Sequence, residues 1–147
     1  MTGASLELPI FDVTARKVHQ WSMVALVVIG FLLGAVGPVA SAVPLVVAGL
    51  VMLVGRFWWP ADVFRQLTWR VLEPAGLVRR RDVHEDHEVR RVARVIGGFA
   101  WLLSAALLAL GAPVVAWVVA FAIAVMVVLD AAADFCALCF LVAQVRR

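Results

Sequence analysis

Charged side chains are scarce in this sequence of 147 residues. They make up 16% of the chain, whereas 65% of the residues are hydrophobic and the mean hydropathy is +1.01. A water-soluble domain typically has about 25% charged and about 45–50% apolar residues. Because a small globule cannot hide so much apolar surface, the composition argues against a soluble protein and predicts an integral membrane protein. The length leaves room for a single domain.

The chain also lacks most signatures that identify an enzyme or a nucleic-acid-binding protein. It has no phosphate-binding glycine-rich loop, no nucleotide-binding fingerprint and no nucleophile–base set for hydrolysis. Its net charge of +3 is the excess expected of cytoplasmic loops, and no nucleic-acid-binding module accompanies it. Two cysteines are too few for a disulfide framework, but their close spacing favours redox or metal chemistry.

Four long apolar runs predict four transmembrane helices, because about 20 apolar residues cross a bilayer. They lie at roughly 20–37, 39–56, 93–110 and 113–135, after a short polar N-terminal arm. Uncharged Gly/Pro turns join them in pairs, which predicts two helical hairpins. The apolar character of the last run continues beyond this span, towards Val145. A cleaved secretory signal ending near Ala40-Ser-Ala42 is the less favoured interpretation, because a polar arm precedes the first basic residues.

The segment between the second and third runs has a different pattern. Over roughly 58–72, apolar residues recur at helical spacing and polar residues take the other side, which predicts an amphipathic helix in the headgroup plane. A frayed continuation of the second span is the alternative. The mixed charges of roughly 73–90 predict a solvated cytoplasmic loop or the first turn of the next helix.

The positions of the basic residues predict the topology. All thirteen Lys and Arg lie in the N-terminal arm, in the central segment 56–94 or at the last two residues, and neither short turn contains one. The positive-inside rule then puts both termini and the central loop in the cytoplasm. We therefore expect a multi-pass protein of the cell inner (plasma) membrane.

The end of the fourth run holds both cysteines. Cys136 and Cys139 are spaced to share one face of a helix, where a disulfide can form. Near the C-terminal end of a helix, with Asp134 close by, a thiolate is disfavoured. The pair is a candidate redox site, and two ordinary small apolar residues in a membrane helix are the alternative.

Two carboxylates accompany the cysteines. Asp130 and Asp134 are four residues apart and share a different helix face. Ionisable groups within spans usually face the bundle interior, so Asp130 is expected to pair with Arg56 or Arg94. Either aspartate is a candidate for tuning the cysteines or relaying protons, and a structural salt bridge or a headgroup location is the alternative.

A metal site is a minor alternative. His84 and His87 lie in the loop on the same side as the cysteines, and two Cys with two His form a valid tetrahedral zinc set. Loop histidines are usually solvated, so we expect no metal and no other cofactor, with zinc or a quinone as alternatives.

Three stretches of the sequence resemble a known family. They are Pro60-x-x-x-Phe64-Arg65-x-Leu67, the arginine-containing entry to the third run, and Leu129-Asp-Ala-Ala-Ala-Asp-Phe-Cys-Ala-Leu-Cys139. Together they resemble the uncharacterised bacterial (actinobacterial-type) membrane family catalogued as domain of unknown function 4395. That family more often has Asn where this chain has Asp130 and Gly where it has Leu138. The resemblance covers most of the chain, but only the cysteine-containing end is specific.

The resemblance implies a class of chemistry but no established activity. Members of the family tend to be encoded near thioredoxin-like and rhodanese-type sulfurtransferase proteins, which implies thiol or sulfane-sulfur traffic at the membrane. We therefore predict that Cys136 and Cys139 cycle between dithiol and disulfide, or persulfide, with such a cytoplasmic partner. A small transporter for a sulfur compound, or a non-catalytic scaffold that binds a partner through 79–81, is the alternative. A homo-oligomer is compatible with either.

Overall fold

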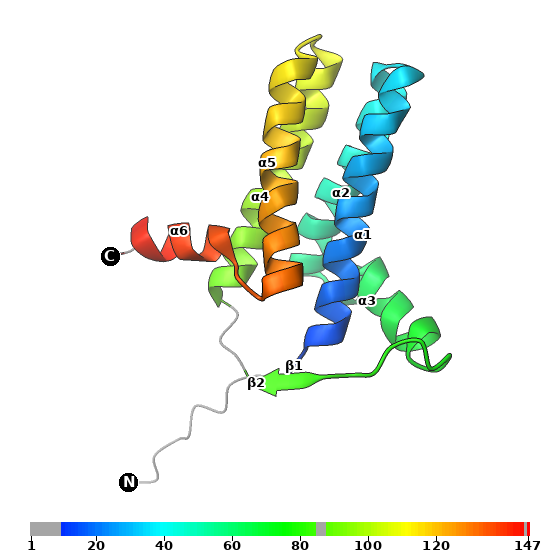
Figure 1. The fold of residues 1–147 in the computed structure, drawn as a ribbon, viewed down its shortest axis with the longest axis vertical. Coiled ribbons are helices and arrows are strands. Elements are labelled where there is room, and N and C mark those ends of the chain that lie inside the picture. The colour runs from blue at the N-terminus through cyan, green and yellow to red at the C-terminus, as the bar shows by residue number, and fades with distance from the viewer. Residues whose placement is uncertain (1–9, 85–87, 146) are drawn as a thin grey trace, which may run out of the picture.

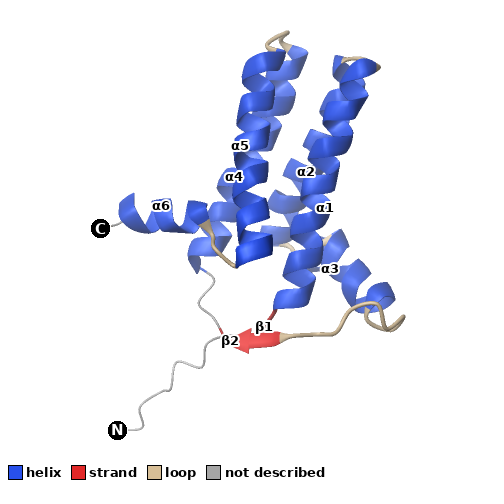
Figure 2. Cartoon of the chain, viewed as in Figure 1, coloured by secondary structure: helices blue, strands red, loops and turns tan. Residues whose placement is uncertain are grey.

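Four long helices form the body of the protein (Figure 1). The computed structural model describes residues 10–84, 88–145 and 147. The long helices are α1 (Val13–Leu32), α2 (Pro38–Phe57), α4 (Glu88–Ala109) and α5 (Pro113–Ala133). Two shorter helices, α3 (Val63–Leu67) and α6 (Ala137–Val145), lie at one end of the bundle (Figures 1 and 2). The predicted all-α class is confirmed, and each long helix is long and apolar enough to cross a membrane.

The predicted Gly/Pro turns separate the long helices in pairs. Between α1 and α2 the chain passes through a 3-10 turn at Leu33–Ala35, and Pro38 then occupies the first turn of α2. Pro113 begins α5 in the same way after Gly111, whose φ of 79° suits glycine. Proline is favoured there because the first helical residues need no backbone N–H donor.

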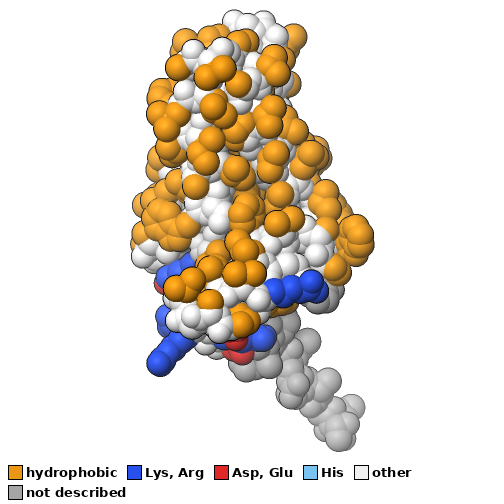
Figure 3. Space-filling view, turned by 90° about the vertical axis from the view of Figure 1, so that its right-hand side faces the viewer, with side chains coloured by type: hydrophobic (Ala, Val, Ile, Leu, Met, Phe, Trp, Pro, Cys, Tyr) orange, Lys and Arg blue, Asp and Glu red, His pale blue; other side chains and the backbone are white. Residues whose placement is uncertain are grey.

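Small residues bring α2 and α4 into the closest contact in the bundle. A Cβ built on Gly49 of α2 would lie 2.8 Å from the Gly98 carbonyl oxygen of α4. Such close approach of two backbones is typical of helices packed within a membrane. Met23, Val27, Leu45 and Trp101 fill the core, whereas the outer faces of the helices carry many exposed large hydrophobic side chains (Figure 3).

The helix starts differ from the prediction. The residues expected to form a polar arm are helical from Val13, because the Asp12 carboxylate caps α1 by accepting from the Thr14 and Ala15 backbone N–H groups. Strand β1 (Ile10–Asp12) precedes this cap and pairs antiparallel with β2 (Asp82–His84) (Figure 2). No periodicity in these three-residue segments predicted the pairing. The other expectation for this loop, a first turn of the next helix, agrees with the start of α4 at Glu88.

The segment predicted as one amphipathic helix is divided. It consists of a 3-10 turn at Trp59–Ala61, helix α3 and a π-helical turn at Thr68–Leu72. Asp62 interrupts it because its side chain caps α3, accepting from the Arg65 backbone N–H at 3.4 Å.

The last span also ends earlier than predicted. Helix α5 stops at Ala133, and Asp134 adopts a left-handed conformation with a φ of 54°. Aspartate tolerates this conformation better than most residues with a side chain. The expectation that both cysteines lie near the C-terminal end of the fourth helix is therefore wrong, and α6 leaves the bundle at a steep angle to α5 (Figure 1).

Candidate functional site

The cysteine pair lies at the start of α6. Cys136 is the residue before the helix, and its carbonyl oxygen accepts from the Phe140 backbone N–H at 3.0 Å. A disulfide joins Cys136 to Cys139, with 5.1 Å between the Cα atoms. The Cys139 backbone N–H also donates to the Cys136 sulfur, at 3.1 Å.

This location reverses the predicted electrostatics of the pair. The sequence placed both cysteines near the C-terminal end of a long helix, where a thiolate is disfavoured. Because the chain breaks at Asp134, Cys136 instead stands at a helix N-terminus, where the free amides and the helix dipole stabilise a negative sulfur. The earlier expectation is wrong, and the break at Asp134 is its physical cause.

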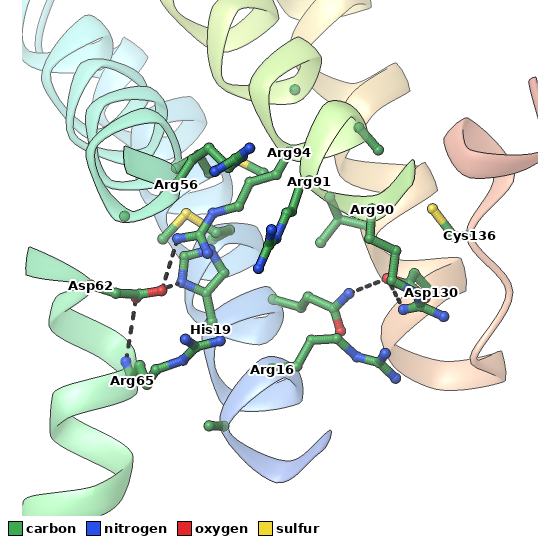
Figure 4. Close-up of a pocket in the computed structure, with 18 of the residues that line it drawn as sticks. Arg16, His19, Arg56, Asp62, Arg65, Arg90, Arg91, Arg94, Asp130 and Cys136 are labelled. Atoms are coloured by element: carbon green, nitrogen blue, oxygen red, sulfur yellow. Dashed lines mark hydrogen bonds and ion pairs between the residues drawn. The ribbon is translucent and has the colours of Figure 1, made fainter. Parts of the chain in front are cut away.

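Asp130 faces the interior, as predicted, but its partners are different. Arg90 of α4 donates from Nη1 to Asp130 Oδ1 at 2.9 Å, and Gln20 of α1 donates to Oδ2 (Figure 4). Neither of the two predicted arginines bonds to it. Arg94 bonds to Asp62 instead, and Arg56 lies over the Phe57 ring. The ion pair is formed by Arg90, one helical turn before Arg94 on α4.

Asp134 lies at the surface, with 52% of its side chain exposed. Arg16 Nη2 is 3.1 Å from its Oδ1 and Lys17 Nζ is 3.3 Å from its Oδ2. Burial raises the pKa of the carboxyl, but the hydrogen bond from Lys17 and the charges of Lys17 and Arg16 outweigh it, so the pKa is lowered. These pairs connect the start of α1 to the end of α5.

A cavity of about 340 Å³ opens among the helix ends and includes Cys136 in its wall (Figure 4). Both Asp130 and Asp62 line it, so two of its carboxylates come from opposite sides of the bundle. The rest of its polar wall consists of arginines from three long helices and α3, together with two other side chains of α1. The arginines are Arg16, Arg56, Arg65, Arg90, Arg91 and Arg94, and the other two side chains are His19 and Gln20.

One polar cluster in this cavity was not predicted. Asp62, 1% exposed, lies 3.3 Å from His19 Nδ1 and 2.9 Å from Arg94 Nη2. Gly55 makes room for the arginine, since a Cβ there would lie 2.5 Å from Arg94 Nη2. Burial raises the pKa of Asp62, but His19 and the charge of Arg94 outweigh it, so the pKa lies well below its ordinary value.

The sequence held a weak signal for this cluster. Asp62 precedes a short helical pattern at a capping position, and His19 lies three residues after Arg16. Recognising α1 as helical from Val13 would have placed His19 inside the bundle.

The predicted zinc set falls partly outside the residues that the structure describes. Within residues 10–84 and 88–145, no group of three or more His, Cys, Asp and Glu side chains is arranged to hold a metal ion. His84 belongs to β2 and His87 lies outside the described residues. The zinc and quinone alternatives stay predictions.

Comparison with known proteins agrees with the resemblance in the sequence. A family model described as a domain of unknown function (DUF4395) matches residues 11–147. The chain belongs to this family. The DUF4395 match includes the cysteine pair, Asp130 and the cavity-lining residues of all four long helices. No curated protein and no solved structure matches the chain.

Proposed function

We propose that this protein is a thiol–disulfide exchange centre at the cytoplasmic surface of the inner membrane. Its Cys136–Cys139 pair would exchange electrons with a thioredoxin-like dithiol protein. The observation that carries the proposal is the placement of Cys136 at the N-terminus of α6, in the wall of an arginine-rich cavity. A helix N-terminus is the usual setting of redox-active cysteine pairs in soluble proteins.

The membrane placement has separate support. The four long helices expose apolar side chains, whereas Lys and Arg gather near one end of the bundle in the face of Figure 3. Under the positive-inside rule that end faces the cytoplasm. The two helix pairs then cross as two hairpins with both termini in the cytoplasm, and α3 and α6 lie near the headgroups.

The exchange transfers the same number of electrons and protons out of one protein as into the other. The Cys136 thiolate attacks a partner disulfide, an S–S bond forms, and the released partner thiolate takes up a proton. Cys139 then loses its proton and attacks the Cys136 sulfur, which releases the second partner thiolate. Two electrons and two protons have moved to the partner, and the intramolecular disulfide results. The reverse sequence reduces the pair again.

The two aspartates would have different roles. Asp134 is a positioning residue, because its left-handed backbone ends α5 and directs the start of α6. Asp130 lines the same cavity as Cys136 and forms an ion pair with Arg90, whereas Asp134 lies outside the cavity wall. We therefore assign to both aspartates an influence on the reactivity of the cysteine pair, and proton transfer to Asp130 alone.

Sulfane-sulfur transfer is the second version of this proposal. A partner persulfide would pass its terminal sulfur to the Cys136 thiolate, leaving a partner thiol and a Cys136 persulfide. The cationic wall of the cavity favours it, since a persulfide anion there would be stabilised by nearby arginines. Mass spectrometry of protein freshly taken from membranes would detect one added sulfur atom on Cys136.

A redox titration tests the exchange directly. Protein in nanodiscs is equilibrated with dithiothreitol buffers and labelled with a maleimide. The label reports on the Cys136–Cys139 pair alone, because the chain has two cysteines. We expect a two-electron transition between about −180 and −270 mV, the range of thioredoxin-like proteins. A pair that remains a dithiol at every potential above the cytosolic one contradicts the proposal.

A trapping pair of variants tests the roles of the two sulfurs. Cys139→Ser leaves Cys136 to attack, so it is mixed with a thioredoxin whose resolving cysteine is replaced and whose remaining cysteine carries thionitrobenzoate in a disulfide. The Cys136 thiolate should displace the coloured thionitrobenzoate anion and accumulate as a mixed disulfide with the thioredoxin. Cys136→Ser is the matched control and should trap much less. Equal trapping by both variants would remove Cys136 as the attacking residue.

A further inference from the structure

The side of the cavity away from Cys136 carries an excess of positive charge. It is lined by Arg56, Arg65, Arg91 and Arg94. Among the described residues on this side, the one carboxylate is Asp62, which pairs with Arg94. Burial lowers the pKa of the Arg65 guanidinium, and the positive charges of Arg94 and Arg91 lower it further against the opposing effect of Asp62. Arginines this close repel one another, so an anion between them would stabilise the arrangement.

Two of these arginines are available to a ligand. Among the described residues, neither Arg56 nor Arg91 has a hydrogen bond or ion pair, and Arg56 lies over the Phe57 ring. They project from the neighbouring ends of α2 and α4 (Figure 4).

The same cavity contains buried acceptors that lack donors. His19 is 7% exposed, its Nδ1 faces Asp62, and Nε2 has no hydrogen-bond partner among the described residues. Because Nδ1 faces a carboxylate, the ring proton is assigned to Nδ1 and Nε2 carries a lone pair. Gln20, 9% exposed, donates to Asp130 and likewise leaves its Oε1 without a donor in the described structure. Buried acceptors of this kind are costly unless a partner binds them.

Above the polar groups the cavity wall is apolar. One residue each from α1 and α2 and three from α5 form it, namely Met23, Met52, Ile123, Met126 and Val127. Methionine adapts its shape to irregular apolar groups, which suits a flexible hydrocarbon.

We propose that this cavity binds the phosphate-bearing head of an anionic amphiphile that also carries a hydroxyl group. Arg56 and Arg91 hold the phosphate oxygens, as planar guanidinium groups do in many phosphate sites. The hydroxyl donates to His19 Nε2 or Gln20 Oε1, and the first methylenes lie against the methionine wall. The volume matches a head group or small molecule, not two whole acyl chains.

This chemistry has two sources, a hydroxyl-bearing lipid headgroup or a soluble phosphate ester. The protein in neutral detergent is therefore titrated with lysophosphatidylglycerol, with lysophosphatidylcholine of the same chain, and with glycerol 3-phosphate, at constant ionic strength. Native mass spectrometry counts bound lipid, and calorimetry follows glycerol 3-phosphate. We expect lysophosphatidylglycerol to bind at least about tenfold more tightly than lysophosphatidylcholine.

Matched variants locate the binding. The double variant Arg56→Gln/Arg91→Gln should bind lysophosphatidylglycerol about tenfold or more weakly. Arg70→Gln is the control, because Arg70 is exposed on the segment after α3 and lies outside the cavity. Its affinity should change less than about twofold, the effect of one distant screened charge.

Every outcome of these titrations either supports or overturns the proposed site. Glycerol 3-phosphate binding as tightly as the lysolipid, with the same dependence on the arginines, supports the site and makes a soluble ester its ligand. Absence of binding by both phosphates, equal binding of lysophosphatidylcholine, or equal losses in the control variant overturns the proposal. The comparison of lysolipids on the unaltered protein needs no variant, so it decides even where the double variant does not fold.

The site is independent of the proposed thiol exchange. The unaltered protein should bind lysophosphatidylglycerol equally before and after reduction of its disulfide, because Cys136 lies on the side of the cavity away from Arg56 (Figure 4). The double arginine variant should keep its disulfide exchange with dithiothreitol, because Arg16 and Arg90 remain in the cavity wall. Lipid binding and disulfide exchange are therefore measured separately, and either proposal can fail while the other stands.

Discussion

Asp62 connects more parts of the molecule than any sequence pattern around it indicated. Its carboxylate lies beside His19 of α1 and Arg94 of α4, and it also caps α3. One buried carboxylate therefore links three helices that are distant in sequence. Removal of one member of such a buried ion pair leaves the other charge without compensation, which is a large energetic penalty.

At this residue scale, we expect Asp62→Asn to lower the free energy of unfolding by about 3 kcal/mol. The folded pKa is depressed, so the stabilisation is complete above the ordinary pKa of about 4 and is lost as the pH falls through and below it. Unfolding by sodium dodecyl sulfate in mixed micelles, at pH 7 and at about pH 2.5, measures both effects. A variant as stable as the unaltered protein at pH 7 would contradict the linking role of Asp62.

The link between α5 and α6 depends on the backbone of Asp134. Asparagine also tolerates the left-handed conformation, whereas alanine there costs roughly 1 kcal/mol. We expect Asp134→Asn to keep the maleimide-labelling rate of reduced Cys136, and Asp134→Ala to change it. Because the ion pairs of Asp134 are exposed, their loss in Asp134→Asn should alter stability little. Equal labelling changes in both variants would assign the effect to charge instead of backbone.

At the scale of elements, α2 and α4 form the tightest contact in the bundle through glycine. Gly49→Ala would bring a Cβ within 2.8 Å of the Gly98 carbonyl oxygen, so we expect destabilisation by about 1–3 kcal/mol. Gly34→Ala is the matched control, since its nearest neighbour, Ser41 Oγ, would lie at an ordinary 3.7 Å. The same detergent titration measures both variants, and equal stability of the two would contradict the close packing.

The four long helices and the turns between them were predictable because their apolar length and Gly/Pro turns are local properties. The break at Asp134 was not, because apolar residues continue on both sides and the determining feature is one left-handed residue. The partner of Asp130 also escaped prediction. Several arginines share one end of α4, and helix rotation, which a sequence does not specify, selects Arg90.

On the scale of the whole molecule, the proposed topology predicts opposite accessibility for the two ends of the bundle. In a background without native cysteines, Val36→Cys in the turn after α1 should react with an impermeant maleimide from the periplasmic side. Cys136 of the reduced, otherwise native protein should react from the cytoplasmic side of inverted vesicles. Labelling of both from the same side would overturn the topology.

The small sheet has a consequence for how the protein is assembled. β1 stands before the first helix but pairs with β2, just ahead of the third long one, and Phe11 of β1 contributes to the cavity wall. In the proposed topology, the first two helices therefore enter the membrane during synthesis with Gln20 still lacking Asp130, its partner from α5. Maturation of the cavity must wait for the second half, so a ribosome-stalled fragment ending near residue 80 should be a preferred target of membrane quality-control proteases.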